Sequence, residues 1–221
     1  MESLKPILLS KNSSSTSPKI DVTSHGVETA RYNSLLHYHH QGTEEYAVFS
    51  CGNRLILFDY TLNQTLIDQK VINDAIMVIT QCRKGSGRLL VCSYDGHIAI
   101  VQVCPEFKSF IVEQDIMEFC EKDAYRYVRH ASLNGDQVSF VSEQGKDTNK
   151  IVTFKASLSS ASEIVEIVGG YRFCEFNKDG KIYAVRKLAK VGQAPETAEK
   201  DLILTYESHL LCPKTGAILS S

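Results

Sequence analysis

Residues 89–103 read LLVCSYDGHIAIVQV, with one Asp-Gly pair between two apolar runs. An Asp-Gly pair in this setting is a strong signal for a two-residue hairpin turn, because both central residues take positive φ. With Asp95-Gly96 at the tip, Tyr94 faces His97. One face of the hairpin then carries Leu90, Cys92, Ala99 and Val101, and the other carries Leu89, Val91, Ile98 and Ile100. Both faces are apolar, so we expect a sheet that is covered on both sides.

Length and charge restrict the class of protein. The chain has 221 residues, a formal net charge of −2 and seven cysteines, enough to bury the core of one domain or of two small ones. The near-neutral charge disfavours nucleic acid as a partner. The basic residues that cluster do so in two small loops, with Arg83, Lys84 and Arg88 in one and Arg186, Lys187 and Lys190 in the other. No apolar run approaches the roughly 18 residues of a membrane span. An odd number of cysteines, mostly inside apolar runs, indicates reduced, buried thiols in the cytoplasm or nucleus.

Similar strand patterns recur along the chain. GNRLILFDYTLNQTLI (52–67) and DGHIAIVQVCPEFKSFI (95–111) share a turn, a strand, a polar break and a second strand. ASLNGDQVSFVS (131–142) and CEFNKDGKIYAVR (174–186) share another pattern, in which a polar turn with Gly separates two apolar strands. Repeats with a period of about 40–50 residues are typical of β-propellers.

These segments resemble WD-repeat proteins. FNKDGK (176–181) matches the FSPDGK-like hairpin of that family, and DGHI (95–98) matches its DGTI-like hairpin. Phe58-Asp59 stands where the family has its Trp-Asp pair. The resemblance implies an all-β, β-propeller-like fold with about four WD-type blades of antiparallel strands. We place these blades at about 30–73, 74–115, 124–168 and 169–221.

The predicted organisation is an N-terminal tail at 1–27, followed by the propeller at 28–221. The tail is either disordered, as the polar run at 10–18 indicates, or an edge strand that closes the ring beside the last blade. The candidates for this strand are KPILL (5–9) and KIDVT (19–23). Four blades are fewer than most members of the family have. Either four blades close, or the chain is part of a larger ring that a partner, a second copy or further sequence completes.

Two further segments have local predictions. Helical periodicity is rare, and the best candidate for a helix is the short segment from Asp115 to Asp123. The polar segment AKVGQAPETAEK (189–200) contains Gly192 and Pro195 and no apolar stripe. We expect it to form a surface loop inside the last blade.

Residues that could carry chemistry are few. His37, His39 and His40 lie close together, but a zinc site needs three or four ligands and no Cys-x-x-Cys accompanies them. Cys92 and His97 would be diagonal neighbours roughly 7–8 Å apart, whereas a nucleophile and its base lie about 3 Å apart. No Gly-rich segment matches a phosphate loop. The sequence therefore predicts no catalytic, cofactor-binding or metal-binding residue, and no cofactor.

Two Tyr-Arg motifs are the candidate partner-binding residues. Each places an arginine between aromatic residues just before a predicted strand. Tyrosine and arginine are enriched in the hot spots of protein interfaces. The alternative is that these rings pack inward at the entry to a blade. The candidates are Tyr125, Arg126 and Tyr127 in the first motif and Tyr171 and Arg172 in the second, which Phe173 follows.

The resulting functional prediction is a non-enzymatic protein-interaction scaffold of the WD-repeat type, a subunit or adaptor that binds other proteins. An alternative comes from a second resemblance. Residues 52–186 are similar to the propellers of endoplasmic-reticulum exchange factors for the Sar-type small GTPase. The shared segments are FDY, SYDGHI, YRY and NKIVTFKA. This implies a propeller of a small-GTPase exchange factor in vesicle coat assembly. The Gly-rich, Lys-containing loop of those proteins has no counterpart here, so exchange activity is assigned to no residue.

Overall fold

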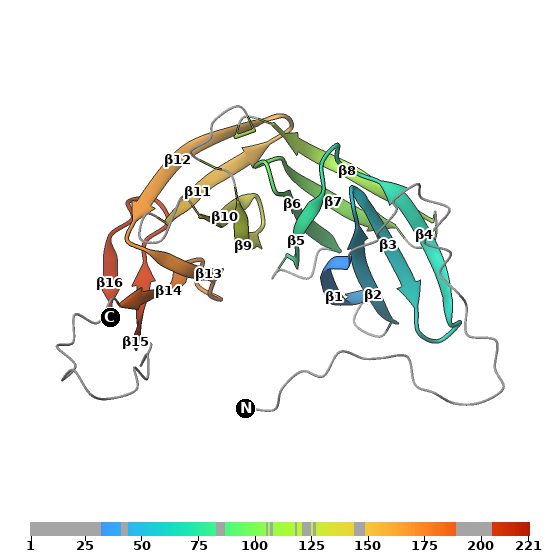
Figure 1. Cartoon of the computed structure of the whole chain (residues 1–221), viewed down its shortest axis with the longest axis horizontal. Helices are drawn as coiled ribbons and strands as arrows, with labels where there is room; N and C mark the ends of the chain where they lie inside the picture. The colour runs from blue at the N-terminus through green and yellow to red at the C-terminus, as the bar shows by residue number, and fades with distance from the viewer. Residues whose placement is uncertain are drawn as a thin grey trace, which may run out of the picture.

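The computed structural model describes residues 32–40, 44–82, 87–104, 106, 108–117, 119–120, 125, 127–143, 149–188 and 205–221. These residues form sixteen β-strands in four antiparallel sheets of four strands each. We name the sheets blades A to D in chain order. The blades follow one another along an open arc (Figure 1). The predicted all-β, propeller-like fold with about four blades is confirmed.

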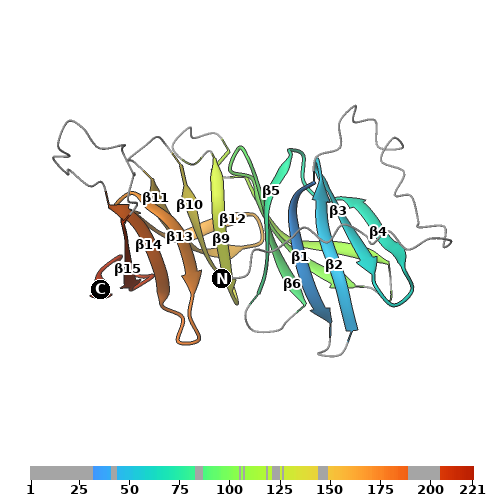
Figure 2. The same cartoon turned by 60° about the horizontal axis from the view of Figure 1, so that its bottom comes forward.

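Each blade is built from four consecutive strands. Blade A consists of β1 (Tyr32–His40), β2 (Glu44–Cys51), β3 (Arg54–Asp59) and β4 (Gln64–Lys70). Blade B consists of β5 (Ile76–Gln81), β6 (Arg88–Ser93), β7 (Ile98–Cys104) and β8 (Ser109–Ile116). Blade C consists of β9 (Val128–Asn134), β10 (Gln137–Ser142), β11 (Lys150–Ser157) and β12 (Ser160–Val168). Blade D consists of β13 (Tyr171–Phe176), β14 (Ile182–Leu188), β15 (Thr205–Leu211) and β16 (Ile218–Ser220). The first strand of each blade lies on the concave side of the arc, and the last lies on the convex side (Figures 1 and 2).

The hairpin of β6 and β7 has a different register from the predicted one. Cys92 lies opposite Ile98, not opposite Ala99. The reason is a loop of three residues, 94–96, because the Ser93 N–H donates to the carbonyl of His97 at 2.8 Å. Gly96 closes the loop with a φ of 87°. Three-residue hairpin loops commonly end in such a left-handed residue, for which glycine is suited.

The observed register decides which residues share a face. Both faces of the hairpin are fully buried, as predicted, but the partners on β7 exchange sides. Leu90, Cys92, Ile98 and Ile100 belong to the core between blades B and C. Leu89, Val91, Ala99 and Val101 belong to the core between blades A and B. Each fully buried aliphatic side chain contributes about 1.5–3 kcal/mol to folding, so this hairpin joins three blades into one structure.

An aromatic cluster fills the junction between blades B and C. Phe119 lies at its centre, with ring centroids 4.9 Å from Tyr125, 5.6 Å from Phe140 and 5.0 Å from Phe154. Such aromatic pairs contribute about 0.5–1.5 kcal/mol each beyond the buried area. The cluster holds the chain between β8 and β9 against the blades on either side.

The helix predicted from Asp115 to Asp123 is wrong for the residues that the structure describes. β8 continues to Ile116, which lies opposite Ile98 of β7. The Asp115 N–H donates to the carbonyl of Leu158 in blade C at 3.0 Å. Pairing with β7 outweighs the weak helical propensity of so short a segment.

Arg88 links blades B and C at the other end of their junction. Its Nε donates to Glu113 at 2.7 Å. Its Nη1 donates to the Gly135 carbonyl and to Asp136, both at 3.1 Å. The sequence assigned Arg88 to a basic loop, but its side chain is only 16% exposed and pairs within the fold.

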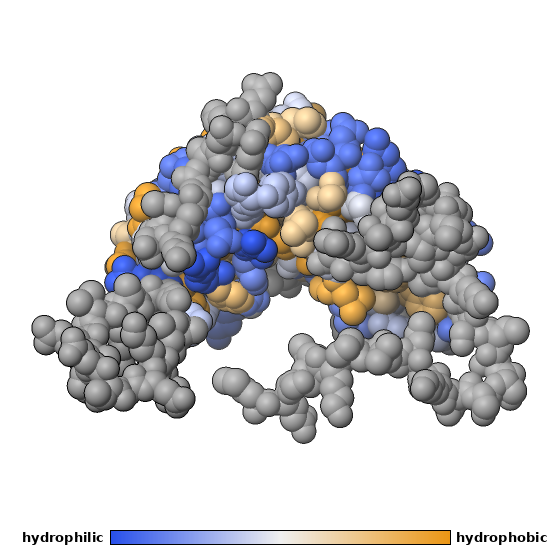
Figure 3. Space-filling view, in the orientation of Figure 1, coloured by the Kyte–Doolittle hydropathy of each residue, from blue (hydrophilic) through white to orange (hydrophobic). Residues whose placement is uncertain are grey.

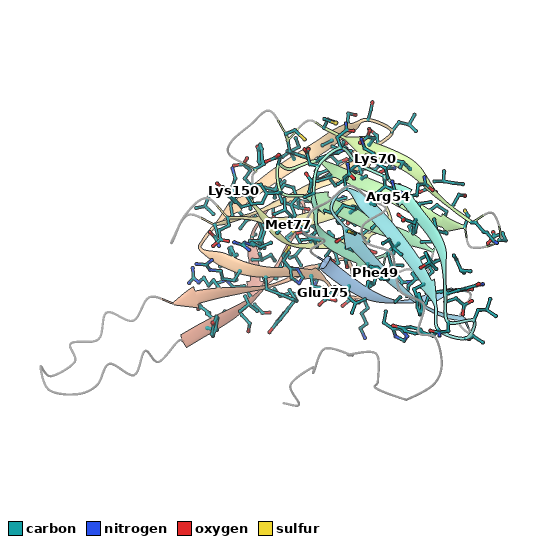
Figure 4. The ribbon with its side chains drawn as sticks, turned by 45° about the vertical axis from the view of Figure 1, so that its right-hand side comes forward. Phe49, Arg54, Lys70, Met77, Lys150 and Glu175 are labelled. Carbon is teal, nitrogen blue, oxygen red and sulfur yellow. The ribbon has the colours of Figure 1, made fainter. Side chains whose placement is uncertain are left out.

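The two ends of the arc differ. The outer face of blade A carries a buried apolar cluster that includes Phe49 of β2 (Figure 4). On blade D, Tyr183 and Tyr206 share the face that points away from blade C, and they are 45% and 55% exposed. Figure 1 shows that blades A and D do not meet. The tail at 1–27 and the loop at 189–200 lie outside the described residues, so both stay predictions.

Candidate protein-interaction surface

Two tyrosines from different blades meet where β6 ends and β9 begins. We call this edge of the blades the upper rim, because it lies at the top in Figure 2. Tyr94 belongs to the loop between β6 and β7, and Tyr127 directly precedes β9. Their ring centroids lie 4.5 Å apart with the planes at 81°, an edge-to-face contact. The Tyr127 N–H donates to the Tyr94 carbonyl at 2.9 Å. The rings are 38% and 41% exposed, so both remain accessible to a partner.

The backbone of Tyr127 is strained. Its φ is 61°, a left-handed conformation that costs an L-residue about 1–2 kcal/mol. The contact and the hydrogen bond with Tyr94 hold it there. Strain of this kind in a non-glycine residue is concentrated at functional sites, and here it projects a half-exposed aromatic ring.

A carboxylate shared by two arginines lies next to this pair. Arg129 of β9 donates through Nε to Glu143 at 2.7 Å, and Arg172 of β13 donates through Nη1 to the other oxygen of Glu143, also at 2.7 Å. The Glu143 N–H donates to the Tyr127 carbonyl at 3.3 Å. Partial burial alone would raise the pKa of Glu143, but the hydrogen bonds from the two arginines lower it. Glu143 is therefore ionised at neutral pH and fixes both guanidinium groups.

We call Tyr94, Tyr127, Arg129, Glu143 and Arg172 the Tyr–Arg surface. Its residues come from blades B, C and D. The upper rim faces the reader in Figure 3, where hydrophilic residues gather over β9, β10 and β13. A hydrogen bond with Tyr127 raises the pKa of Tyr94. Its phenol is therefore neutral at physiological pH, and its hydroxyl is engaged with that of Tyr127.

The structure separates the predicted partner-binding residues into two groups. Tyr127 and Arg172 lie on the Tyr–Arg surface. Tyr125 and Tyr171 are buried and face the core. The hydroxyl of Tyr125 donates to the Glu166 carboxylate, and that of Tyr171 lies 3.0 Å from His209 Nδ1.

Lys150, labelled in Figure 4, lies with its Nζ 4.4 Å from the centroid of the Tyr125 ring. This contact and the hydrogen bond to Glu166 engage both the ring and the hydroxyl of Tyr125 within the fold, which indicates a structural role. Arg126 lies outside the described residues.

Sequence reasoning missed Tyr94, Arg129 and Glu143. A signal existed for Tyr94, because it directly precedes the Asp-Gly turn, where a hairpin exposes its side chains. Arg129 and Glu143 have no comparable signal. Their pairing depends on the registers of β9 and β10 and on the approach of blade D.

The sheet separates Cys92 from His97, the two residues weighed above as a nucleophile and its base, because their side chains lie on opposite faces. Cys92 faces the core between blades B and C, where burial strongly raises its pKa. His97 binds the Asp115 carboxylate through Nε2. Cys92 and His97 therefore cannot act together as a nucleophile and its base.

The histidines near the N-terminus also lack a metal-binding arrangement in the part of the chain that is described. The ring of His37 lies 5.9 Å from that of Tyr60, centroid to centroid. The side chains of His39 and His40 are outside the described set. Among the described residues, no group of three or more His, Cys, Asp or Glu side chains could hold a metal ion.

An open pocket of about 180 Å³ lies between blades A and B. Its polar side chains come from four places: the end of β4, the segment after β4, the residue just before β7, and β8. The lining residues are Lys70, Val71, Ile72, Asn73, His97 and Asp115. His97 and Asp115 bind each other, but the described lining holds no Ser, Thr or Cys side chain that such a pair could activate. The Tyr–Arg surface is therefore the stronger candidate.

Comparisons with known proteins support the fold. No protein-family model matches the chain, and no curated protein matches its sequence. The β-propeller domain of Myceliophteria thermophila Cps50 (Swd1) is similar at 12% identity, covering 70% of this chain and 50% of that one, with a TM-score of 0.55. Kuenenia stuttgartiensis hydrazine synthase is similar at 14% identity, covering 88% of this chain and 51% of that one, with a TM-score of 0.56.

This chain therefore spans about half the length of the solved structures it matches. At such low identity the likeness shows the fold alone. Within the described residues, no helix is long and apolar enough to cross a membrane. The chain has a β-propeller architecture, and its membership of the WD-repeat family stays a prediction.

Proposed function

We propose that this chain is a non-catalytic protein-interaction scaffold that holds a partner protein on the Tyr–Arg surface, as a subunit or adaptor of a larger complex. The observation that carries the proposal is the contact of the Tyr94 and Tyr127 rings from two blades, with the exposed Arg129 close enough to interact electrostatically with Tyr94. Tyrosine and arginine dominate interface hot spots. Tyrosine rings also provide a large contact area at a small cost in conformational entropy.

The surface is fixed before a partner arrives. Tyr127 is held through its backbone N–H, and Glu143 restrains Arg129 and Arg172 by two short hydrogen bonds. Ordering a long side chain on binding costs about 0.5–1.5 kcal/mol. A surface whose side chains are already ordered avoids much of that cost, which supports a binding role.

The open arc supports the same role. The outward face of blade D exposes Tyr183 and Tyr206, and exposed apolar faces of this kind mark interaction sites. At the three junctions between consecutive blades, one sheet covers another. The proposal therefore includes a further β-sheet, from a partner protein or a second copy, that covers this face. No observation on the described residues favours the exchange-factor alternative.

The test is affinity capture from the native cell with three forms of the chain. The first is the wild type, and the second carries Tyr94→Ser and Tyr127→Asn, because asparagine tolerates positive φ. The control carries Tyr60→Ser and Leu62→Ser, which remove two exposed apolar side chains from the β3–β4 loop of blade A. All three must give the same circular dichroism spectrum.

We expect one or more proteins to be retained by the wild type and the control, and to fall at least ~10-fold with the Tyr94/Tyr127 variant, the loss typical of a hot spot. Equal retention of every protein by the Tyr94/Tyr127 variant and the wild type would contradict the proposal.

A further inference from the structure

We infer that the Tyr–Arg surface receives an acidic side chain of the partner, an Asp or Glu carboxylate bound by Arg129 beside the rings of Tyr94 and Tyr127. This inference rests on the proposed function and names the chemistry of the partner. It follows from the donors that the surface presents and from its balance of charge.

Arg129 has unused hydrogen-bonding capacity. A guanidinium group has five N–H donors, and among the described residues the hydrogen bond recorded for Arg129 is the one from Nε to Glu143. The side chain is 58% exposed. Its terminal nitrogens are thus available for a planar acceptor with two oxygens, and a carboxylate fits a guanidinium edge with two parallel hydrogen bonds.

The charges of the surface favour an anion. Glu143 carries one negative charge between two arginines, so Arg129, Glu143 and Arg172 together keep one positive charge. Because one hydroxyl of the Tyr94–Tyr127 pair donates to the other, the pair keeps one O–H as a further hydrogen-bond donor. The surface thus offers donors and a positive charge to a group that accepts hydrogen bonds and is negative.

The same charges limit how acidic the partner is. Asp95 follows Tyr94 in the hairpin loop and interacts electrostatically with it. A run of acidic residues would be repelled by Asp95, whereas one carboxylate can lie on the Arg129 side of the rings. A phosphate shares the anionic oxygen chemistry, but its charge of nearly two calls for a second free guanidinium. Arg172 is less exposed than Arg129, 36% against 58%, so the geometry favours a carboxylate on Arg129 alone.

The test uses a displayed library of short random peptides, selected on the folded wild-type chain. We expect the retained peptides to share one Asp or Glu, and its replacement by Asn or Gln to weaken binding by ~10- to 100-fold, as the loss of a charged hydrogen bond does. The variant Arg129→Gln should cause a similar loss. Combining the two changes should add little, because both remove one contact. The matched control Arg54→Gln breaks an arginine–carboxylate pair in blade A and should leave binding unchanged.

The other outcomes overturn the inference in distinguishable ways. Peptides that need Tyr94 and Tyr127 but tolerate the amide replacement would refute the acidic contact and leave the proposed function standing. A preference for phosphoserine over the matched glutamate would refute the carboxylate. Peptides that bind the Tyr94→Ser, Tyr127→Asn variant as well as the wild type would refute the inference, and affinity capture would then decide the proposed function alone.

Discussion

Replacing Gly96 by alanine should destabilise the protein far more than the same change at Gly52. Both glycines lie in the loop between the second and third strands of a blade, and both have positive φ, 87° for Gly96 and 58° for Gly52. They differ in their surroundings. A Cβ at Gly96 would lie 3.2 Å from the carbonyl oxygens of Phe119 and Tyr125, whereas a Cβ at Gly52 would meet nothing within 4 Å.

The magnitudes follow from these two differences. An L-residue in the left-handed region costs about 1–2 kcal/mol, and the smaller entropy of the unfolded alanine chain returns about 0.4–1 kcal/mol. Gly52→Ala should therefore cost about 1 kcal/mol. Gly96→Ala must also displace two backbone carbonyls next to the aromatic cluster, and overpacking of this kind costs about 1–3 kcal/mol. We expect a total of ~2–4 kcal/mol.

Urea unfolding followed by circular dichroism gives the free energy of unfolding of both variants and of the wild type. An unchanged slope m checks that the same transition is observed in all three. The difference between the two losses should exceed ~1 kcal/mol, the lower end of the overpacking cost. Equal losses would show that Gly96 is needed only for its φ, and that the hairpin loop does not lie against the segment before β9.

Three further predictions concern thiols, pH and the junction of blades B and C. The Thr215 hydroxyl and nearby backbone N–H groups lower the pKa of Cys212. An alkylating reagent should therefore label Cys212 before the buried Cys92, and equal labelling rates in mass spectrometry would contradict this. Burial lowers the pKa of His130. The free energy of unfolding should therefore fall as the pH drops below about 6.5, where the histidine of the unfolded chain gains a proton. In urea titrations at several pH values, His130→Phe should flatten that fall. Arg88→Lys should lose ~1–2 kcal/mol, because lysine cannot bind the three acceptors in the arginine geometry; an unchanged urea midpoint would argue against the bridge.

The fold could be predicted from local patterns because each blade repeats them. Apolar residues on both faces of 89–103 indicate a sheet between two others, and the cores on either side of this hairpin bear that out. The register could not be predicted, because Asp-Gly suits a two-residue turn and also a three-residue loop with Gly96 last. The helix predicted at 115–123 was wrong at its described start, because the pairing of Asp115 and Ile116 with β7 depends on contacts that a short window does not contain.

The surface could be predicted only in part. Tyr127 and Arg172 belong to motifs that combine aromatic residues with arginine, and the pattern identified them. The same pattern also selected Tyr125 and Tyr171, which are buried, because a motif before a strand does not reveal which ring faces inward. Tyr94 meets Tyr127 only through the approach of two blades, and no local pattern encodes that contact.

Hydrogen exchange of the chain with and without its captured partner tests the central claim most directly. If the partner binds the Tyr–Arg surface, protection should increase in the β6–β7 loop at 94–97, at the start of β9 and at the start of β13. Peptides from the opposite rim, such as the β13–β14 loop at 177–181, should exchange unchanged. Protection confined to that opposite rim, with none at 94–97 and 127–130, would contradict the account.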